Sequence, residues 1–534
     1  LEDYNLYTTD QALGEGIKRE GADWADESLF DFGAKIGTKS FLQLGHDANR
    51  FPPELHTHDR YGHRIDEVTF HPAYHELMRT SVAAEIHALP WNHTQSGAHV
   101  ARVAKHYMMS QVEAGHMCPI TMTFAVVPAL DAQPEIAAEW LPRVCSTEYD
   151  PVLKPAHEKT GCIMGMAMTE KQGGSDVRAN TTTAVPLDKK GPGRVYFLTG
   201  HKWFCSAPMS DAFLTLAQTQ KGLTCFIVPR FLPDDSRNNI RIQRLKDKLG
   251  NRSNASSEIE FDHTWAQMVG EEGRGVPTII EMVNHTRLDC LVGSAGLMRQ
   301  ALVQAIHHCS QRAAFGKTLS TQPLMQQVLA DLALESEAAT LLMLRLARGY
   351  DASAHDEGEA ALTRILTAVT KFWVCKRGPA MVYEAMECHG GIGYVEESIM
   401  PRIYREIPLA SIWEGSGNVM CLDVLRAMER EPQTVPALLE ELDKAKGGHP
   451  AYDQHIKGLK TLLSKSKDLE RNARCLVQQM ALAAQAALVI QHSPEYVSDA
   501  FCASRLGEGA TAQLFGALPD GVDVDDILGR AGKY

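Results

Sequence analysis

The sequence predicts a multidomain α+β protein with an N-terminal helical domain, a central antiparallel β-barrel or sandwich, and a C-terminal four-helix bundle with an extra helical tail. Closely spaced strand-like segments without intervening helices fill residues 161–270, which is typical of an antiparallel sheet and not of βαβ units. Long segments with apolar residues at helical spacing lie on both sides. A length of 534 residues also favours several domains.

The N-terminal domain is assigned to residues 1–160. Its first part, residues 1–70, has mixed composition and turn signals such as Phe51-Pro52-Pro53, so we expect it to be rich in loops. Residues 71–142 carry apolar side chains at i, i+3, i+4 and i+7, which predicts helices. Because the chain begins with Leu and not Met, we expect the natural N-terminus to lie upstream.

The central domain is assigned to residues 161–270. Its strand-like segments are rich in β-branched and aromatic residues and are separated by Gly, Pro and Asn turns. The sequence shows no G-x-G-x-x-G after a first strand, which disfavours a Rossmann site. The expected strands are Cys162–Met168, Thr181–Leu187, Arg194–Cys205, Ala212–Ala217, Leu223–Arg230, Ile240–Leu245 and Ser256–Phe261.

The helical bundle is assigned to residues 271–430 and the extra C-terminal domain to residues 431–534. Long apolar-faced segments without strand signals predict a bundle, and a Glu-Pro break near residue 431 separates it from the tail. The expected bundle helices are 277–314, 321–350, 360–389 and 418–429.

Composition limits the classes of function. A net charge of −13 opposes a chain-wide affinity for nucleic acid or anionic membranes, and no apolar run reaches the length of a membrane span. The 12 cysteines are scattered without a C-x-x-C pair, which indicates reduced thiols in a cytoplasmic or matrix-like compartment. A group of histidines lacks a recognised ligand spacing, so we predict no metal site; it comprises His56, His58, His63, His71 and His75.

The segment Ser411–Asn418, Ser-Ile-Trp-Glu-Gly-Ser-Gly-Asn, is the most informative stretch. It places the carboxylate of Glu414 beside Trp413 and before a glycine-rich turn that opens an apolar helix. Free N–H groups and the helix dipole at such a start favour a phosphate. This arrangement predicts a base next to a bound nucleotide cofactor, whereas the plain structural alternative is a first-turn carboxylate that only complements the dipole.

Four further segments could contact a ligand, although each alone has a plain structural explanation. Met168–Asp176 is a glycine turn with two hydroxyls, and Trp203–Ser206 ends a strand with an aromatic pair. Gln311–Lys317 offers a guanidinium and an aromatic ring at a helix end, or is simply a capped helix. His389–Tyr394 is a glycine turn that suits either a ligand or an inter-helix loop.

The order of these segments resembles the acyl-CoA dehydrogenase family over roughly residues 70–430. Pro52–Leu55, Cys118–Phe124, Leu245–Ala255 and the helical tail are similar to its AidB-like, alkylation-response subgroup. The resemblance implies an FAD-dependent flavoprotein that dehydrogenates a fatty acyl-CoA at Cα and Cβ, with Glu414 as the catalytic base. It also implies a homotetramer whose FAD sites are shared between subunits.

The resemblance assigns residues by motif position. Arg287 matches a helix start near the CoA end of the substrate. One departure is Phe-Cys-Ser after Trp203, where the family often has Thr-Asn after Trp-Ile, so the flavin hydrogen bond is expected from Ser206 or a backbone group. The implied FAD contacts are Met166, Thr169, Ser175, Trp203, Phe204, Ser206, Arg312, Phe315, Gly390, Gly391, Gly415, Ser416, Gly417 and Asn418.

Three alternatives to a turning-over dehydrogenase stay open. One is a flavoprotein that sequesters acyl-CoA with little turnover. Another is DNA binding through the tail, where Lys457, Lys460, Lys465, Lys467, Arg471 and Arg474 would form a basic stripe, although the tail has 11 Lys and Arg against 14 Asp and Glu. The third is an acyl-CoA oxidase. Acyl-chain length and the electron acceptor are not set by the sequence.

Overall fold

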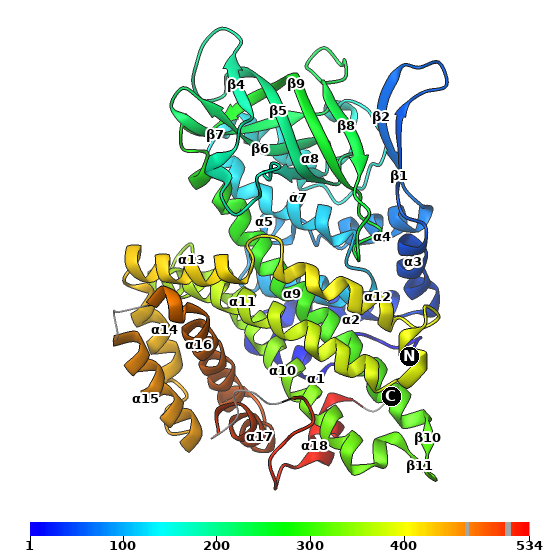
Figure 1. Cartoon of the computed structure of the whole chain (residues 1–534), viewed down its shortest axis with the longest axis vertical. Helices are drawn as coiled ribbons and strands as arrows, with labels where there is room; N and C mark the ends of the chain where they lie inside the picture. Colours follow the sequence, from blue (N-terminus) through cyan, green and yellow to red (C-terminus); the bar gives the residue numbers. More distant parts are fainter. Residues whose placement is uncertain (465–468, 508–513, 533–534) are drawn as a thin grey trace. The chain divides into compact units, whose positions relative to one another are not determined.

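The computed structural model describes residues 1–464, 469–507 and 514–532. Contacts within the chain define two units. The first unit comprises Leu1–Lys39, Gln95–Gln111 and Arg287–Tyr534, and the second comprises Ser40–Thr94 and Val112–Thr286. Helices, then strands, then helices follow one another along the chain as predicted (Figure 1). The bounds of the four domains drawn from the sequence stay predictions.

The second unit contains a seven-stranded sheet whose strands lie close to their predicted positions. The longest pairing joins β5 and β9 antiparallel, but β3 and β4 pair in parallel with β6, so the sheet is not purely antiparallel. Strand β9 runs eight residues beyond the predicted end. His263 adopts a φ of 51° where the β5–β9 register shifts, and the strand continues past this irregularity. The strands are β3 (Met164–Ala167), β4 (Thr183–Pro186), β5 (Val195–Ser206), β6 (Ala212–Thr219), β7 (Gly222–Pro229), β8 (Ile240–Leu245) and β9 (Ser256–Val269).

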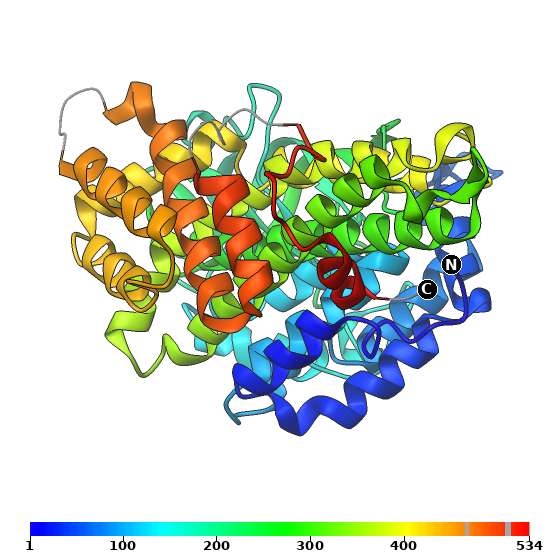
Figure 2. The same ribbon diagram turned by 90° about the horizontal axis from the view of Figure 1, so that it is seen from below.

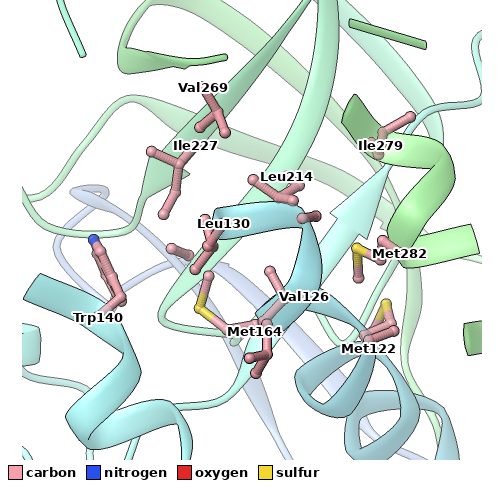
Figure 3. Packing of buried hydrophobic residues seen from close by; sticks show 14 of the residues in the cluster. Met122, Val126, Leu130, Trp140, Met164, Leu214, Ile227, Val269, Ile279 and Met282 are labelled. Carbon is pink, nitrogen blue, oxygen red and sulfur yellow. The ribbon is translucent and has the colours of Figure 1, made fainter. Parts of the chain in front are cut away.

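One face of this sheet packs against helix α7 (Met117–Leu130), which is apolar on nearly all sides. A helix of that kind is stable only when it is buried. Figure 3 shows Val126 and Leu130 of α7 pointing toward Leu214 and Ile227 of the sheet. The other helices of the unit are α3 (Lys39–Arg50), α4 (Pro72–Ala83), α5 (Leu89–Asn92) and α8 (Pro134–Val144).

The first unit is helical and its core is formed by three long helices. Helix α10 (Pro323–Ala352) packs along α11 (Glu357–Glu387), and α13 (Gly417–Arg430) packs on α11. Helix α9 (Gly275–Gln311) enters this unit at Arg287. Its shorter elements are α1 (Gln11–Arg19), α2 (Asp26–Ile36), α6 (Ala98–Val112), η5 (Gly390–Tyr394), α12 (Met400–Glu406), η6 (Ile407–Ser411) and a small β10–β11 hairpin (Ala313–Ala314, Lys317–Thr318).

The predicted helical tail packs onto the bundle instead of standing apart. Helix α16 (Leu469–His492) contacts α10, α11 and α13, and α18 (Val524–Ala531) contacts α10 (Figure 2). Helix α16 is long and apolar enough to cross a membrane, but 72% of its most apolar stretch is buried within the protein, as in the core helix of a folded domain. The remaining tail helices are α14 (Thr434–Asp443), α15 (Pro450–Ser464) and α17 (Glu495–Leu506).

The expectation of loops over residues 1–70 is wrong. Helices α1, α2 and α3 and a hairpin of β1 (Glu54–His58) and β2 (Arg64–Thr69) occupy this stretch. The turn signals at Phe51-Pro52-Pro53 and Tyr61-Gly62 mark real breaks beside and within the hairpin, but they do not extend over the rest of the stretch. Gly37 serves close packing, because a Cβ there would overlap the Tyr4 carbonyl oxygen. The side chain of Asp10 caps α1 by accepting from the Leu13 N–H, a start signal that short helices need.

Candidate active site

The Trp413–Asn418 segment of the first unit forms a tight turn before α13. Glu414 has a φ of 55° and Gly415 a φ of 102°, so both lie in the left-handed region that most side chains avoid. A non-glycine residue held there is strained, and such strain is typical of functional sites. The Glu414 side chain is partly exposed.

Two cations from neighbouring helices hold the backbone of this turn. Arg287 Nε on α9 donates to the Glu414 carbonyl oxygen at 3.1 Å. Lys371 Nζ on α11 donates to the Trp413 carbonyl oxygen at 2.7 Å and also to that of Gly415. Three successive carbonyls are therefore bound by charged donors, which offsets the strain at Glu414 and fixes its backbone.

The Arg287 guanidinium is itself fixed by Asp423 on α13. Arg287 Nη1 donates to Asp423 Oδ2 at 3.0 Å, and Arg364 Nη1 donates to the same oxygen at 3.2 Å. Arg287 is only 7% exposed. These contacts give Arg287 a role inside the turn, while its predicted contact with the CoA end of a substrate stays a prediction.

The start of α13 fits an anionic group. The Ser416 side chain makes no capping hydrogen bond there, which leaves first-turn N–H groups without that partner in the described structure. Gly415 needs glycine, because its φ is 102° and a Cβ there would overlap Met420; a Cβ on Gly417 would lie 2.8 Å from Lys376 Cε, the end of a flexible side chain. Lys376 and Arg474, which donates to Asn418 Oδ1 at 3.4 Å, add positive charge nearby. The first-turn N–H groups, the dipole of α13 and the two nearby cations together suit a phosphate.

In the second unit, the Met168–Asp176 turn is attached to the end of β5. The Trp203 N–H donates to the Thr169 carbonyl oxygen at 2.8 Å, which joins two of the predicted motifs. Gly174 lies against Thr169, where a Cβ would be 2.5 Å from its Oγ1. Ser175 is exposed at the tip of the turn, and Met166 lies partly buried on β3. Backbone and hydroxyl donors are therefore presented on one turn.

A buried ion pair anchors this turn from within. Lys202 Nζ donates to Glu170 Oε1 at 2.9 Å, and both side chains are fully buried. The N–H groups of Thr181 and Thr182 also donate to the Glu170 carboxylate, at 2.6 and 3.1 Å. Burial acts to raise the pKa of Glu170, but the Lys202 charge and the hydrogen bonds outweigh it and lower the pKa to about 2. Glu170 is therefore ionised at neutral pH.

Trp203 and Phe204 form an aromatic surface with cations close to it. Lys246 Nζ lies 3.7 Å from the centre of the Trp203 ring and 4.5 Å from that of Phe204, and it also pairs with Glu258 at 2.7 Å. Phe204 is 47% exposed. Beyond them, Ser206 Oγ lies 3.3 Å from Ser256 Oγ. A half-exposed aromatic pair beside fixed positive charge suits a planar, electron-rich ring.

Two predicted contact segments lie at the surface of the first unit. Arg312 is exposed just after the end of α9, and Phe315 is 97% exposed at the tip of the β10–β11 hairpin, with a φ of 52°. Gly390 and Gly391 are exposed in η5, where Gly390 has a φ of 62°. The Phe315 ring is therefore fully accessible to another molecule.

Sequence analysis missed the residues that hold the two turns. Lys371 and Asp423 carry no motif signal of their own, and Lys202 was passed over in favour of its neighbour Trp203. A usable signal existed at Lys371, because it is a charged residue within an otherwise apolar helical stretch and must be paired when buried.

Four of the six residues of the predicted basic stripe lie within the part of the tail that the structure describes. Lys465 and Lys467 lie outside the described residues. Lys460 pairs with Asp443 at 3.0 Å and Arg474 contacts Asn418, while Lys457 and Arg471 are exposed. DNA binding therefore stays an untested alternative. Among the described residues, no three His, Cys, Asp or Glu side chains are grouped to hold a metal ion.

Three family models match successive parts of the chain. Residues 1–151 match the adaptive response protein AidB N-terminal domain, residues 165–264 the acyl-CoA dehydrogenase middle domain, and residues 273–429 the acyl-CoA dehydrogenase C-terminal domain. The Escherichia coli protein named "Putative acyl-CoA dehydrogenase AidB" is 47% identical over 94% of this chain and 92% of its own length.

Solved structures support the same assignment. The Caenorhabditis elegans protein ACDH-11, in complex with C11-CoA, superimposes with a TM-score of 0.88 at 27% identity, over 98% of this chain and 95% of that one. The Bd2924 apo-form gives a TM-score of 0.85 at 29% identity, over 92% and 99%. The chain therefore belongs to the acyl-CoA dehydrogenase family, in its AidB-like subgroup, and has the fold of that family.

Proposed function

We propose that the protein is an FAD-dependent acyl-CoA dehydrogenase in which the Glu414 carboxylate removes the α-proton of a fatty acyl thioester. The observation that carries the proposal is the Arg287 and Lys371 clamp on three successive carbonyls of the Glu414 turn. A base works best when its geometry is fixed before the substrate arrives. The N–H of Glu414 would donate to the thioester oxygen as negative charge develops there.

FAD would supply, when bound, the acceptor for the hydride that leaves the β-carbon. We propose that the start of α13 at Gly417 and Asn418 holds a phosphate, and that Thr169, Ser175 and Ser206 donate to the flavin. Trp203 and Phe204 would cover its ring. The uncapped helix start and the strained Gly415 before it support the phosphate assignment.

Arg312, Phe315, Gly390 and Gly391 are proposed to reach the FAD of another subunit in a homotetramer. The 97% exposure of Phe315 at the hairpin tip supports this, because the ring is free to contact a second subunit. We expect Phe315→Ala to leave the unfolding free energy within about 0.5 kcal/mol of wild type while FAD is lost on dilution. Loss of FAD would be followed by flavin fluorescence, and retention of FAD in the variant would contradict the shared site.

The substrate is proposed to be a fatty acyl-CoA of intermediate length, since the C. elegans relative was solved with C11-CoA. A cytoplasmic, reducing location is part of the same proposal and is supported by the 12 cysteines, all of which are free thiols.

Anaerobic titration with acyl-CoAs of graded length tests the function. Bleaching of the bound flavin by one chain class is the expected result. A bound flavin that none of them reduces would contradict the proposal and favour acyl-CoA sequestration. Peroxide formed at the rate of turnover in air would instead identify an oxidase.

A further inference from the structure

A pocket of about 130 Å³ lies in the second unit, where α8 meets β7 and β9 of the sheet. The last parts of the two strands form its floor, and α8 and the segments 154–157 and 231–233 form most of its walls. Alternate residues of each strand line it, because the side chains of a strand point to opposite faces in turn. A cavity of roughly 150 Å³ holds a benzene ring, so this pocket has room for about one aromatic ring.

The fold fixes the floor of the pocket. The pairing of β7 with β9 ends at Ile227 and Gln267. Beyond this point the buried Asn238 side chain bridges the strands, because its Nδ2 donates to the carbonyl oxygens of Pro229 at 2.7 Å and of Trp265 at 2.8 Å. Asn238 Oδ1 also accepts from the Trp265 N–H at 3.0 Å. The strands are therefore held open at the pocket, and the Trp265 backbone is fixed there.

Three aromatic rings line the pocket without a ring partner. They belong to Trp140 on α8, to Phe231 and to Trp265, and none of them contacts another aromatic ring in the described part of the chain. Trp140 is 5% exposed and belongs to the buried cluster of Figure 3. Its indole N–H makes no hydrogen bond within the described residues, although a buried indole N–H usually finds a partner. The pocket thus offers aromatic surface together with an unused donor.

Arg143 on α8 supplies positive charge at the pocket. Its Nη2 donates to the His157 carbonyl oxygen at 3.2 Å and its Nη1 to the Glu139 carbonyl oxygen at 3.4 Å, so the guanidinium is held between α8 and the neighbouring segment. Both acceptors are neutral, and Arg143 makes no ion pair among the residues that the structure describes. A guanidinium has more N–H donors than these two acceptors use, so Arg143 can also bind an anion.

The other charged side chains at the pocket do not compete for that anion. Lys154 pairs with Asp150 at 3.0 Å, and Asp211 pairs with Lys159 at 2.7 Å, so each lining charge is already neutralised. Glu139 is exposed on α8 and forms no ion pair in the described structure. Its carboxylate is the one lining charge that would oppose an anion and favour a cation, which makes it a useful control.

We propose that this pocket binds a small planar aromatic carboxylate. The ring packs against Trp140, Phe231 and Trp265, and the carboxylate accepts hydrogen bonds from the Arg143 guanidinium. Offset or edge-on packing of aromatic rings is favourable beyond the area that it buries. A guanidinium is also the side chain whose planar geometry best matches a carboxylate.

The pocket is separate from the proposed flavin surface. Gln267 pairs with Val195 at the start of β5, whereas Trp203 lies near the end of that strand. The stretch of strand from 195 to 203 spans roughly 25 Å at the usual rise per residue. Segment 154–157, Trp265 and Gln267 also lie outside the parts of the chain that match the family models. The proposal therefore goes beyond the proposed dehydrogenase function and does not rest on it.

Calorimetric titration of the full-length protein with benzoate, phenylacetate and indole-3-acetate tests the proposal. Saturable binding of at least one acid, one molecule per chain and without a change in the visible absorption spectrum, is the expected result. The neutral amide of that acid should bind about tenfold more weakly, because hydrogen bonds to a charged group contribute at least that factor. Binding of none of the acids, equal binding of the amide, or a shift in the spectrum of bound flavin overturns the proposal.

Variants locate the binding. Arg143→Gln should weaken binding of the acid by about tenfold, and Trp265→Leu by about fivefold. Arg79→Gln, at an exposed arginine of the same unit, and Glu139→Gln should each stay within about twofold of wild type or bind more tightly. Wild-type affinity in Arg143→Gln or in Trp265→Leu overturns the proposal. A loss in Glu139→Gln as large as that in Arg143→Gln also overturns it, because the ligand would then be a zwitterion. Circular dichroism of each variant checks that it is folded.

Discussion

Two glycine-rich turns, one in each unit, are held by opposite devices. In the turn at Glu414, the carbonyls face outward to cations of neighbouring helices, Arg287 and Lys371. In the turn at Glu170, the anion lies within the turn, and Lys202 and neighbouring N–H groups donate to it. The first turn is fixed by residues far away in the sequence, and the second carries its own anchor in its motif. Removal of the anchors should therefore mainly lower the reaction rate at the first turn and the stability of the fold at the second.

The largest expected loss of stability is at the second turn. Glu170→Gln leaves the buried Lys202 ammonium without its counter-charge, so we expect the unfolding free energy to fall by about 3 kcal/mol at pH 7. Because the pKa of Glu170 is lowered in the folded protein to about 2, its contribution is present above the unfolded pKa of about 4.3 and is lost as the pH falls toward 2. Urea unfolding of both proteins at pH 7, 5 and 3 measures this.

A matched control for that prediction is Glu76→Gln, which breaks an exposed pair with Arg79 whose side chains are 44% and 53% exposed. It should change the unfolding free energy by less than about 1 kcal/mol. A difference between wild type and Glu170→Gln that stays constant down to pH 3 would show that the ionised carboxylate is not what stabilises the turn.

At the first turn, removal of an anchor should affect rate more than folding. Lys371→Met leaves the carbonyls of Trp413 and Gly415 without this donor, so the Glu414 backbone is held only by Arg287. Misplacement of a base by about 1 Å costs roughly 100-fold in rate. We expect the rate of flavin reduction by acyl-CoA to fall by about that factor, with a smaller change in the acyl-CoA concentration at half-saturation.

Lys460→Met is the control, since this lysine pairs with Asp443 at an exposed site. It should reduce the flavin at the wild-type rate. A Lys371→Met protein that reacts normally would show that the clamp is structural and unrelated to the chemistry.

The smallest expected effect concerns backbone strain at the first turn. Gly415→Ala places a Cβ at a φ of 102° and against Met420, so we expect a loss of about 1–2 kcal/mol in unfolding free energy. Gly447→Ala tests strain alone, since Gly447 has a φ of 82° and no atom within 4 Å of an added Cβ. Equal losses in thermal or urea unfolding would mean that the packing against Met420 contributes nothing.

Sequence patterns predicted the order of helices and strands, because the spacing of apolar residues is a property of each element by itself. The strands of the sheet accordingly lie near their expected positions. The patterns failed over residues 1–70, where a mixed composition with two local turn signals was taken to mean loops throughout, although helices α1 to α3 fill most of the stretch. The turns around Glu414 and Glu170 were recognisable from glycine, hydroxyl and carboxylate residues within a few positions. The anchors of the Glu414 turn were not, since Lys371 reaches this turn only through the packing of α11 beside it, and Asp423 acts through Arg287.

The most direct test of Glu414 as the base is α-proton exchange in deuterated buffer with FAD bound. Wild-type protein should exchange the α-hydrogen of an acyl-CoA that it cannot oxidise fully, because proton removal is reversible. Glu414→Gln, with its flavin spectrum unchanged, should lose this exchange by roughly 100-fold or more, the usual contribution of a general base. Exchange at the wild-type rate in the variant would contradict the account.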